Sequence, residues 1–427
     1  MFTNLLAALS RIEAGAGHDL AGIQEEAMSF LDGLKAHLVR DPEPVFALLR
    51  RVKPILIVKG TAIVTRFEDV QEVLERDNVF QVTYGEKMRV VTGGNDFFLG
   101  MQDSPEYTRD VSHMRTVMRR EDISAMAPFI AKTAGDIVAA AGSQLDIPKQ
   151  LSKAVPARWI ADYFGCPSTS EEDLESWSST IFQYLFTDLT NDPVVDAAAI
   201  DASAKTRAWL DRTIVARKAN PTAKDDVLGR CLALQSAGVS AMTDLDIRNN
   251  LLGLLVGAIP TTSKCCAQAL DQLLNRPEQL AGAQAAARAD DDPLLARYVF
   301  EALRFNPNNP GVFRIAAEDY TLAKGQLHET TIPKGTMVLP ATQSAMFDER
   351  IVDNPNDFRI DRPAWTDMQF GYGMHTCFGQ YVNRVQIPGI LKPVLQKAGL
   401  ERAGELQFDG PFPSSLPVRF AAAQAAR

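Results

Sequence analysis

A cysteine set among glycines is the part of the chain best suited to do chemistry. The stretch from Phe370 to Gly379 holds Cys377, with Gly371 and Gly373 before it and Gly379 after it. Because glycine has no Cβ, these positions let the backbone turn tightly and come close to a flat ligand. A helix is expected to begin after Gly379, and a helix N-terminus favours negative charge and lowers the pKa of a thiol. The stretch therefore predicts a thiolate ligand.

The same ten residues resemble a known haem-binding loop. They satisfy the pattern F-x-x-G-x-[HR]-x-C-x-G of the cytochrome P450 family at every fixed position. The resemblance implies haem b (iron protoporphyrin IX) with its iron bound by Cys377, and with Phe370, Gly371, His375 and Gly379 around it. A thiolate ligand gives electron density to the iron, which favours O–O cleavage. The alternative is a glycine-rich loop beside a buried structural cysteine, since free cysteines are often buried.

Composition and charge argue against several functional classes of protein. The chain has 427 residues, 46% of them hydrophobic, and a net charge of −9, which argues against a nucleic-acid binder. No apolar run is long enough to cross a bilayer and the N-terminus lacks a basic region, so we expect a cytoplasmic protein without a transmembrane segment. Its five cysteines are an odd number without metal-finger spacing, which argues against a disulfide framework and a zinc site.

The start of the chain predicts two parts. Residues 1–43 carry helical periodicity alone and are expected to form an N-terminal helical arm, with a single cytochrome P450 domain at 44–427. The β-rich runs 55–58 and 62–65, joined by a Lys-Gly turn, predict a hairpin, and 67–76 predicts a helix after it. This order resembles the N-terminal β region of the family. The expected fold class is mainly α with a minor β region, the cytochrome P450 fold.

Further along, the pattern predicts helices and one long loop. Residues 80–101 mix glycines with aromatic residues and predict a surface loop that, by resemblance, covers the substrate. Residues 125–164 are predicted to be almost entirely helical. Two more helices, 171–189 and 196–218, resemble the pair that forms a roof over the substrate, which makes Phe182 a pocket candidate.

A run of about thirty residues, 244–274, predicts a helix long enough to cross the domain. Its centre, Gly257 to Thr262, resembles the family motif A-G-x-[DE]-T-T, with Pro260 in place of the acid. The resemblance places Thr261 and Thr262 beside bound O₂ and Ala258 beside the haem. Proline in a helix costs roughly 3 kcal/mol unless the helix is opened there, and here it also removes the carboxylate used in proton delivery. The alternative for Thr261 is a packed hydroxyl bonded back to a carbonyl.

Several other residues match the family pattern in the expected order. Glu301 and Arg304 match E-x-x-R and can form a charge-assisted pair one turn apart, which we assign to structural support. Arg314 and His375 correspond to residues that bind haem propionates, and both suit an anionic carboxylate. Tyr107 stands where the family has a histidine and can still donate one hydrogen bond.

The resemblance also suggests a substrate pocket and a reaction. The expected reaction inserts one atom of O₂ into a small apolar organic substrate. The chain shows no glycine-rich phosphate motif, so electrons are expected from a separate ferredoxin and ferredoxin reductase. The ferredoxin would be attracted by Arg362, Arg384 and Lys392 on the Cys377 side. The pocket candidates are Val256, Ile259, Val312 and Phe182, together with Ser415 in an expected last hairpin at 414–420.

Three other functions remain open at this point. The missing acid at Pro260 fits a peroxide-driven peroxygenase, or a haem-thiolate isomerase or dehydratase that never activates O₂. A haem-binding sensor or carrier is the alternative that is not an enzyme.

Overall fold

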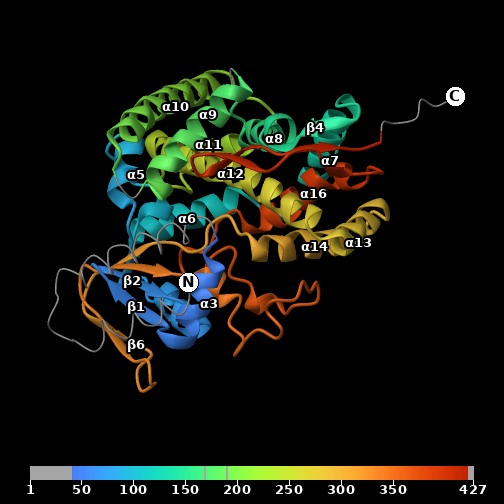
Figure 1. The fold of residues 1–427 in the computed structure, drawn as a ribbon. Coiled ribbons are helices and arrows are strands. Elements are labelled where there is room, and N and C mark those ends of the chain that lie inside the picture. The colour runs from blue at the N-terminus through green and yellow to red at the C-terminus, as the bar shows by residue number, and fades with distance from the viewer. Residues whose placement is uncertain (1–40, 168–169, 189–190, 422–427) are drawn as a thin grey trace.

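The structure, a computed structural model, describes residues 41–167, 170–188 and 191–421. The expected N-terminal arm, residues 1–43, lies outside these ranges except for its last three residues. The described chain is mainly helical, with a minor β region in several small sheets, as the sequence predicted (Figure 1). The helices are α3 (Glu43–Val52), α4 (Phe67–Glu75), α5 (Gly85–Thr92), α6 (Pro105–Val117), α7 (Ile123–Ala140), α8 (Ala154–Phe164), α9 (Glu171–Phe182), α10 (Pro193–Ala219), α11 (Val227–Ser236), α12 (Asp244–Leu274), α13 (Pro277–Arg288), α14 (Asp292–Phe305), α15 (Thr342–Ala345) and α16 (Gln380–Leu395).

Short helical turns connect several of these elements. Three are 3₁₀ turns, η1 (Phe98–Gly100), η2 (Arg120–Asp122) and η5 (Ala364–Thr366). Two are π-helical turns, η3 (Ile147–Ser152) and η4 (Gln183–Thr187). η4 continues α9 directly, so the helix expected at 171–189 changes its winding near Gln183.

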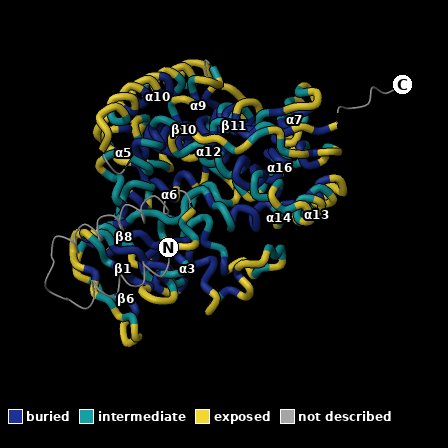
Figure 2. Tube along the Cα trace, viewed as in Figure 1, coloured by how far each residue is buried: buried dark blue, intermediate teal, exposed yellow. Residues whose placement is uncertain are grey.

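Helix α12 is the centre of the helical part, with the bounds that the sequence predicted. Thr243 and Asp246 form a capping box at its start, which satisfies amide groups that a helix N-terminus otherwise leaves unpaired. Helices α8, α9, α10, α14 and α16 pack around it. Figure 2 shows α12 among buried residues while α10 and α13 carry exposed outer faces. The helix runs on through Pro260, which cannot donate a hydrogen bond to the carbonyl of Val256.

The largest sheet has five strands in the order β1-β2-β8-β5-β3. The predicted hairpin is confirmed: Ile55 pairs with Val64 and Val58 with Thr61. Strand β8 adds to β2 in parallel, and β5 joins β8 to β3. The strands are β1 (Ile55–Val58), β2 (Thr61–Val64), β3 (Phe80–Val82), β4 (Gln144–Asp146), β5 (Arg314–Ala316), β6 (Tyr320–Leu322), β7 (Thr330–Ile332), β8 (Met337–Pro340), β9 (Glu401–Arg402), β10 (Gln407–Asp409), β11 (Phe412–Ser415) and β12 (Pro417–Arg419).

Three predictions of local structure were wrong. Residues 80–101 form β3, α5 and η1 in place of a long loop, and Phe98 is fully buried. The helix expected over 125–164 is interrupted by β4 and η3. The last hairpin joins β10 to β11, whereas β12 pairs with β4 and β9. The strands at 412–419 therefore belong to two different sheets, a long-range pairing that a local pattern does not reveal.

Candidate functional site

The Cys377 loop has the tight backbone that its glycines predicted. Gly371 and Gly373 have φ angles of 75° and 72°, a region that residues with a side chain rarely adopt. A Cβ on Gly373 would lie 2.4 Å from the carbonyl oxygen of Leu74, so the loop also presses against α4. The amide of Cys377 donates to the carbonyl of Phe370 at 2.8 Å, which closes the loop. Helix α16 begins directly after Gly379.

The thiol of Cys377 lies inside the protein but is not sealed into the core. The side chain is partly accessible, like most of its neighbours in the loop. Burial raises the pKa of the Cys377 thiol, and a hydrogen bond from the backbone of Gly379 acts in the opposite direction. A backbone donor on sulfur and the N-terminus of α16 both stabilise a negative charge there. A cationic metal at this sulfur would complete the stabilisation of the thiolate.

Arg314 and His375 form a buried, positively charged corner beside the loop. Arg314 on β5 is 4% exposed, and the one hydrogen bond from its side chain to a described residue goes to the carbonyl of Phe313 at 2.9 Å. Both ring nitrogens of His375 are buried without a hydrogen-bond partner among the described residues. Burial and the charge of Arg314 lower the pKa of His375 to about 4. Buried donors without acceptors favour an anionic ligand here, such as a carboxylate.

Tyr107 lies in this corner but has a different hydrogen-bond partner from the one expected. Its hydroxyl donates to the carbonyl of Met374 at 3.0 Å, and its ring centre lies 6.1 Å from that of His375. Burial raises the pKa of the Tyr107 hydroxyl. Its single donor is thus used to hold the Cys377 loop, so Tyr107 positions the loop instead of contacting an anion.

Across from the loop, one face of α12 is left accessible in a stretch that is otherwise buried. Between Ile247 and Leu270 every residue is buried except five, which lie at positions i, i+1, i+4, i+7 and i+8. This spacing puts them on one face of a helix. Thr262, next to these residues, bonds to Asn383 on α16, and a Cβ on Gly379 would lie 3.6 Å from Nδ2 of Asn383 and 3.9 Å from Sγ of Cys377, so this part of α12 lies near the loop. Burial raises the pKa of the Cys265 thiol to about 12. The five residues, called here the accessible stripe, are Gly257, Ala258, Thr261, Lys264 and Cys265.

The two threonines of α12 have different partners. The hydroxyl of Thr261 donates to the carbonyl of Gly257, so its oxygen lone pairs remain available to accept a hydrogen bond. Thr262 is buried, and its hydroxyl donates to Oδ1 of Asn383 on α16 at 3.1 Å. Thr261 therefore keeps a free acceptor oxygen on the accessible stripe, whereas Thr262 connects α12 to α16.

Other residues proposed from the sequence lie away from the accessible stripe. Val256 and Ile259 are 1% and 0% exposed and belong to the core, because they lie on the packed faces of α12. Pro260 is also buried. Ser415 donates to Asp146 at 2.6 Å and so joins β11 to β4. Val256, Ile259 and Ser415 thus lie at packing or structural positions, whereas the effect of Pro260 on proton delivery stays a prediction and Ala258 lies on the stripe.

An aromatic cluster joins the end of α9 to β11 and to the turn before α5. The ring of Phe182 lies 4.6 Å from that of Phe186 and 5.5 Å from that of Phe412, and Phe186 lies 4.7 Å from Tyr84. The four residues come from α9, η4, β11 and the turn before α5. Val312, the remaining pocket candidate, is partly accessible and packs against the core of the β region. No local pattern indicated Tyr84 or Phe412, because only the fold brings these residues together.

Glu301 and Arg304 form a buried network, larger than the pair expected. Arg304 donates to Glu301 at 2.7 and 3.0 Å, and both side chains are 5% exposed. Glu301 also accepts from Nε of Arg362 at 3.0 Å and from the amide of Arg359 at 2.9 Å. Arg362 is 10% exposed and is held in this network by its ion pair with Glu301. It therefore does not lie on the exposed docking surface that the sequence predicted. The network fixes the segment before the Cys377 loop to α14.

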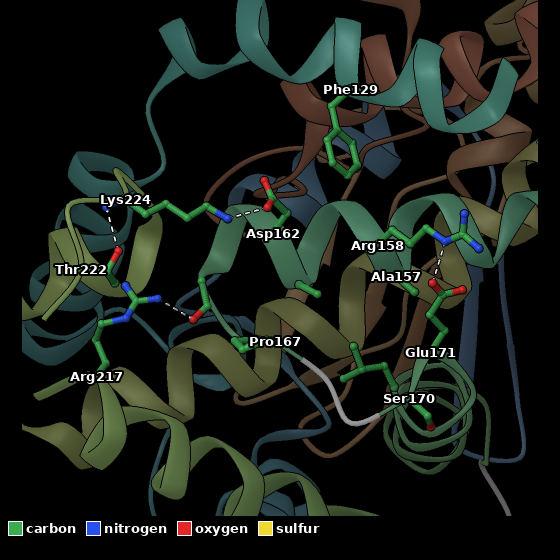
Figure 3. Close-up of a pocket in the computed structure, with 13 residues that line it drawn as sticks. Phe129, Ala157, Arg158, Asp162, Pro167, Ser170, Glu171, Arg217, Thr222 and Lys224 are labelled. Carbon is green, nitrogen blue, oxygen red and sulfur yellow. Dashed lines mark hydrogen bonds and ion pairs between the residues drawn. The ribbon is translucent and has the colours of Figure 1, made fainter. Parts of the chain in front are cut away.

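A separate hollow of about 780 Å³ opens between α7, α8, α9 and the loop after α10 (Figure 3). Its charged side chains are paired: Arg158 with Glu171, Lys224 with Asp162, and Arg217 with Asp226 outside the hollow. None of the residues discussed above lines it. The hollow is therefore distinct from the Cys377 site.

Among the described residues, no group of three or more histidine, cysteine or acidic side chains could hold a metal ion by itself. A single thiolate can bind a metal only as part of a larger ligand, and the buried Arg314 and His375 beside it call for an anion. A haem supplies both the iron and the carboxylates. The residues present therefore fit a haem.

The family model for cytochrome P450 matches residues 55–406. The chain belongs to the cytochrome P450 family. It is a P450 monooxygenase, and the cofactor of the family is haem b. It is 27% identical over 349 residues to mycinamicin IV hydroxylase/epoxidase of Micromonospora griseorubida, covering 78% of this chain and 81% of that protein. It is 25% identical over 363 residues to vitamin D(3) 25-hydroxylase of Pseudonocardia autotrophica, covering 81% and 84%.

Solved structures show the same fold. The crystal structure of CalO2 superposes with a TM-score of 0.77 at 23% identity, covering 91% of this chain and 98% of that one. P450BioI, in complex with an acyl carrier protein that bears hexadec-9Z-enoic acid, gives a TM-score of 0.78 at 20% identity, covering 90% and 100%.

In the described part of the chain, one helical stretch, Pro105–Ala140, is long and apolar enough to be a candidate membrane span, with a mean hydropathy of 1.2 over its best window. The turn between α6 and α7 divides it into two helices.

Proposed function

We propose that this P450 inserts one oxygen atom from O₂ into a small apolar organic substrate, with Cys377 as the thiolate ligand of the haem iron. The observation that carries the proposal is the arrangement of two elements: a glycine-turned loop presents Cys377, and the accessible stripe of α12, with Thr261, lies near it. Haem bound there supplies the redox chemistry of O₂ activation. The cytoplasm is the proposed compartment.

The propionates are proposed to bind in the corner of Arg314 and His375. A carboxylate placed there would accept hydrogen bonds from the imidazole, which has no partner among the described residues, and from the guanidinium, whose side-chain hydrogen bond goes to the carbonyl of Phe313. Its negative charge would also offset the desolvation of Arg314. Tyr107 supports this site indirectly, through its hydrogen bond to Met374. Phe370 and Gly379 frame Cys377 from the two sides of the loop.

The proposed catalytic role of Thr261 follows from the direction of its hydrogen bond. Because the hydroxyl donates to Gly257, its oxygen can accept a hydrogen bond from water or from another protonated group. Thr261 can thus hold a proton donor at a fixed place on the stripe, which is general acid catalysis through a positioned relay. Proline at position 260 leaves the carbonyl of Val256 without its usual helical donor, so this carbonyl is a second acceptor close by.

The proposed substrate site adjoins the aromatic cluster of Tyr84, Phe182, Phe186 and Phe412. Aromatic walls suit an apolar organic molecule, since their large surfaces contribute most of the energy of apolar contact. Two relatives are named as a mycinamicin IV hydroxylase/epoxidase and a vitamin D(3) 25-hydroxylase. We propose a substrate of this broad apolar class.

The electrons are proposed to come from a ferredoxin and its reductase. Of the three basic residues considered for docking, Arg384 is the most accessible, at 42%, and pairs with Asp367. Lys392 is 17% exposed and held by Asp290 and Asp292. Arg384 is thus the one of the three that remains a docking candidate.

Isotope labelling separates this function from its alternatives. A substrate found by a type I spectral shift is incubated with ¹⁸O₂, NADPH, a ferredoxin and its reductase, and in parallel with hydrogen peroxide alone. The proposal predicts product with one ¹⁸O atom that depends strictly on the reductase. Product from peroxide alone would favour a peroxygenase, unlabelled isomerised or dehydrated product would favour non-redox chemistry, and no product with either oxidant would favour a haem-binding sensor.

A further inference from the structure

Lys264 is a lysine in an unusual position, on the accessible stripe of the central helix. It follows Thr261 by three residues, which places the two side chains as neighbours on one helix face. The helices around it are packed, so its amino group cannot lie freely in solvent as surface lysines do. The family resemblance assigned nothing to this position, and a charged side chain here needs an explanation.

The amino group of Lys264 has no counter-ion. Among the described residues none forms a hydrogen bond or ion pair with it, and the one titratable group whose charge affects it is the thiol of Cys265. Among the described residues, no acidic or basic side chain affects Lys264 from the elements that pack against α12, which are α6, α8, α9, α10, α13, α14, α16, η3 and β11. Burial lowers the pKa of Lys264 to about 8. Such a group exchanges protons readily near neutral pH.

Further buried polar atoms without a hydrogen-bond partner among the described residues lie beyond Lys264, toward the C-terminal end of α12. Gln268, one turn further on, is buried, and its Oε1 has no partner among the described residues. Its Nε2 donates to Asn306 at 3.0 Å, which fixes the direction of the amide. On α16, the buried Nε2 of Gln386 also lacks a partner, one turn from the Asn383 that accepts from Thr262. Buried polar atoms of this kind are commonly satisfied by water.

We propose that Lys264 holds the proton that is delivered to Thr261, in place of the carboxylate that Pro260 has replaced. This inference rests on the proposed oxygen-inserting function. The ammonium of Lys264 passes one proton to a water held by Oγ1 of Thr261, that water gives one of its own protons to the oxygen being reduced, and Lys264 becomes a neutral amine. The amine then regains a proton from solvent through water bound at Gln268. Proton and charge balance, and no further reactant is needed.

Two variants of Lys264 test the role, with an unrelated lysine as control. Lys264→Met removes the proton, and Lys264→Arg keeps a positive charge at the same place. Lys132→Met changes a lysine that is 78% exposed and pairs with Asp136 on α7. The measured quantity is coupling, the product formed per electron pair consumed with O₂. Lys264→Met is expected to lower coupling about tenfold or more, and Lys132→Met to leave it unchanged.

The pH profile distinguishes a proton donor from a packing residue. Wild-type coupling should fall as pH rises through about 8, where the ammonium of Lys264 is lost. Lys264→Arg should lower coupling as Lys264→Met does, because a guanidinium keeps the positive charge but does not release its proton. Lys264→Met should show a low and flat profile in the same range. Adding Pro260→Asp to Lys264→Met should restore coupling several-fold, since it returns a carboxylate beside Thr261.

A measurement independent of turnover is the titration of Lys264 itself. Reductive ¹³C-methylation of the lysines, followed by NMR of the diamagnetic ferrous carbonyl form, gives the pKa of each amine. The signal missing in Lys264→Met is assigned to Lys264 and should titrate near pH 8. A pKa above about 10, the ordinary value for lysine, would overturn the proposal.

The outcomes separate this proposal from the proposed function. If wild type is active and Lys264→Met has the same coupling and pH profile, only the role of Lys264 is overturned. If Lys264→Met raises the apparent Kd of acidic substrates but keeps coupling, Lys264 anchors a carboxylate instead and the proton role is overturned. If wild type forms no product, the proposed function fails together with this role.

Discussion

His375 lies beside Arg314, and burial together with the charge of that guanidinium lowers the pKa of the imidazole to about 4. Neither side chain finds an anion among the described residues, although both are well placed to donate to one. An anionic group bound between them would be stabilised by two donors in a place of low water content. This pair therefore identifies the end of the site where the haem carboxylates are expected.

Removing Arg314 should weaken haem binding. Arg314→Met takes away the one buried cation at this corner, so we expect at least about a tenfold rise in the dissociation constant for haem. The ratio of Soret to protein absorbance after gel filtration measures haem retention. Arg89→Met is the matched control, because Arg89 is about half exposed and pairs with surface carboxylates. Equal haem retention in the two variants would show that Arg314 does not hold the cofactor.

His375 should make the haem-free protein less stable in acid. Its pKa is about 4 in the folded chain and about 6.5 in the unfolded chain, so between these values the unfolded chain binds more protons. The free energy of unfolding should therefore fall as pH drops from about 6.5 to 4, by about 2 kcal/mol from this residue. His375→Asn should lose this component. Urea unfolding of both proteins at pH 7 and pH 4.5 measures it, and parallel pH dependences would rule it out.

The buried network around Glu301 should contribute more to the free energy of unfolding than an exposed ion pair does. Glu301→Ala leaves Arg304 and Arg362 buried without their carboxylate, a change that typically costs 3–5 kcal/mol. Glu171→Ala removes a pair whose members are 43% and 45% exposed and should cost less than about 1 kcal/mol. Midpoints of thermal unfolding, measured at equal haem content, compare the two. Similar midpoints would mean that the network adds no stability beyond that of a surface pair.

The aromatic cluster should control substrate affinity without affecting the haem. Phe186→Ala removes a ring that contacts both Phe182 and Tyr84, so the dissociation constant of an apolar type I ligand should rise about tenfold. Phe408→Ala, at a side chain that is 49% exposed on β10, is the control. Spectral titration measures the affinity. A Phe186→Ala protein with wild-type affinity would place the substrate elsewhere.

The sequence predicted the helices and strands best where the local signals were strong. The bounds of α12 were predictable because a capping box at Thr243 precedes a long apolar run, and the hairpin of β1 and β2 because a Lys-Gly turn joins two β-rich runs. Residues 80–101 were mistaken for a loop because their regular structure depends on contacts with residues far away in the sequence. Phe97, for example, packs against Gly253 so closely that a Cβ there would lie 2.4 Å from its ring.

The side of α12 that faces the ligand could be predicted only in part. Thr261 and Ala258 were found by resemblance, and helical spacing from Thr261 would have added Lys264 and Cys265. Val256 and Ile259 were misplaced because hydrophobicity alone does not say whether a residue faces a ligand or the core. Ser415 was misplaced for another reason: its partner, Asp146, is 269 residues away in the chain.

The identity of the iron ligand is the central claim, and exchange of two thiols tests it most directly. Cys377 and Cys265 lie near each other, so each serves as the control for the other. The absorption spectrum of the reduced, CO-bound protein distinguishes a thiolate-ligated haem from one ligated by nitrogen or oxygen. We predict that Cys265→Ser keeps the thiolate spectrum and that Cys377→Ser loses it. A thiolate spectrum that persists in Cys377→Ser, or that disappears in Cys265→Ser alone, would contradict the assignment of Cys377.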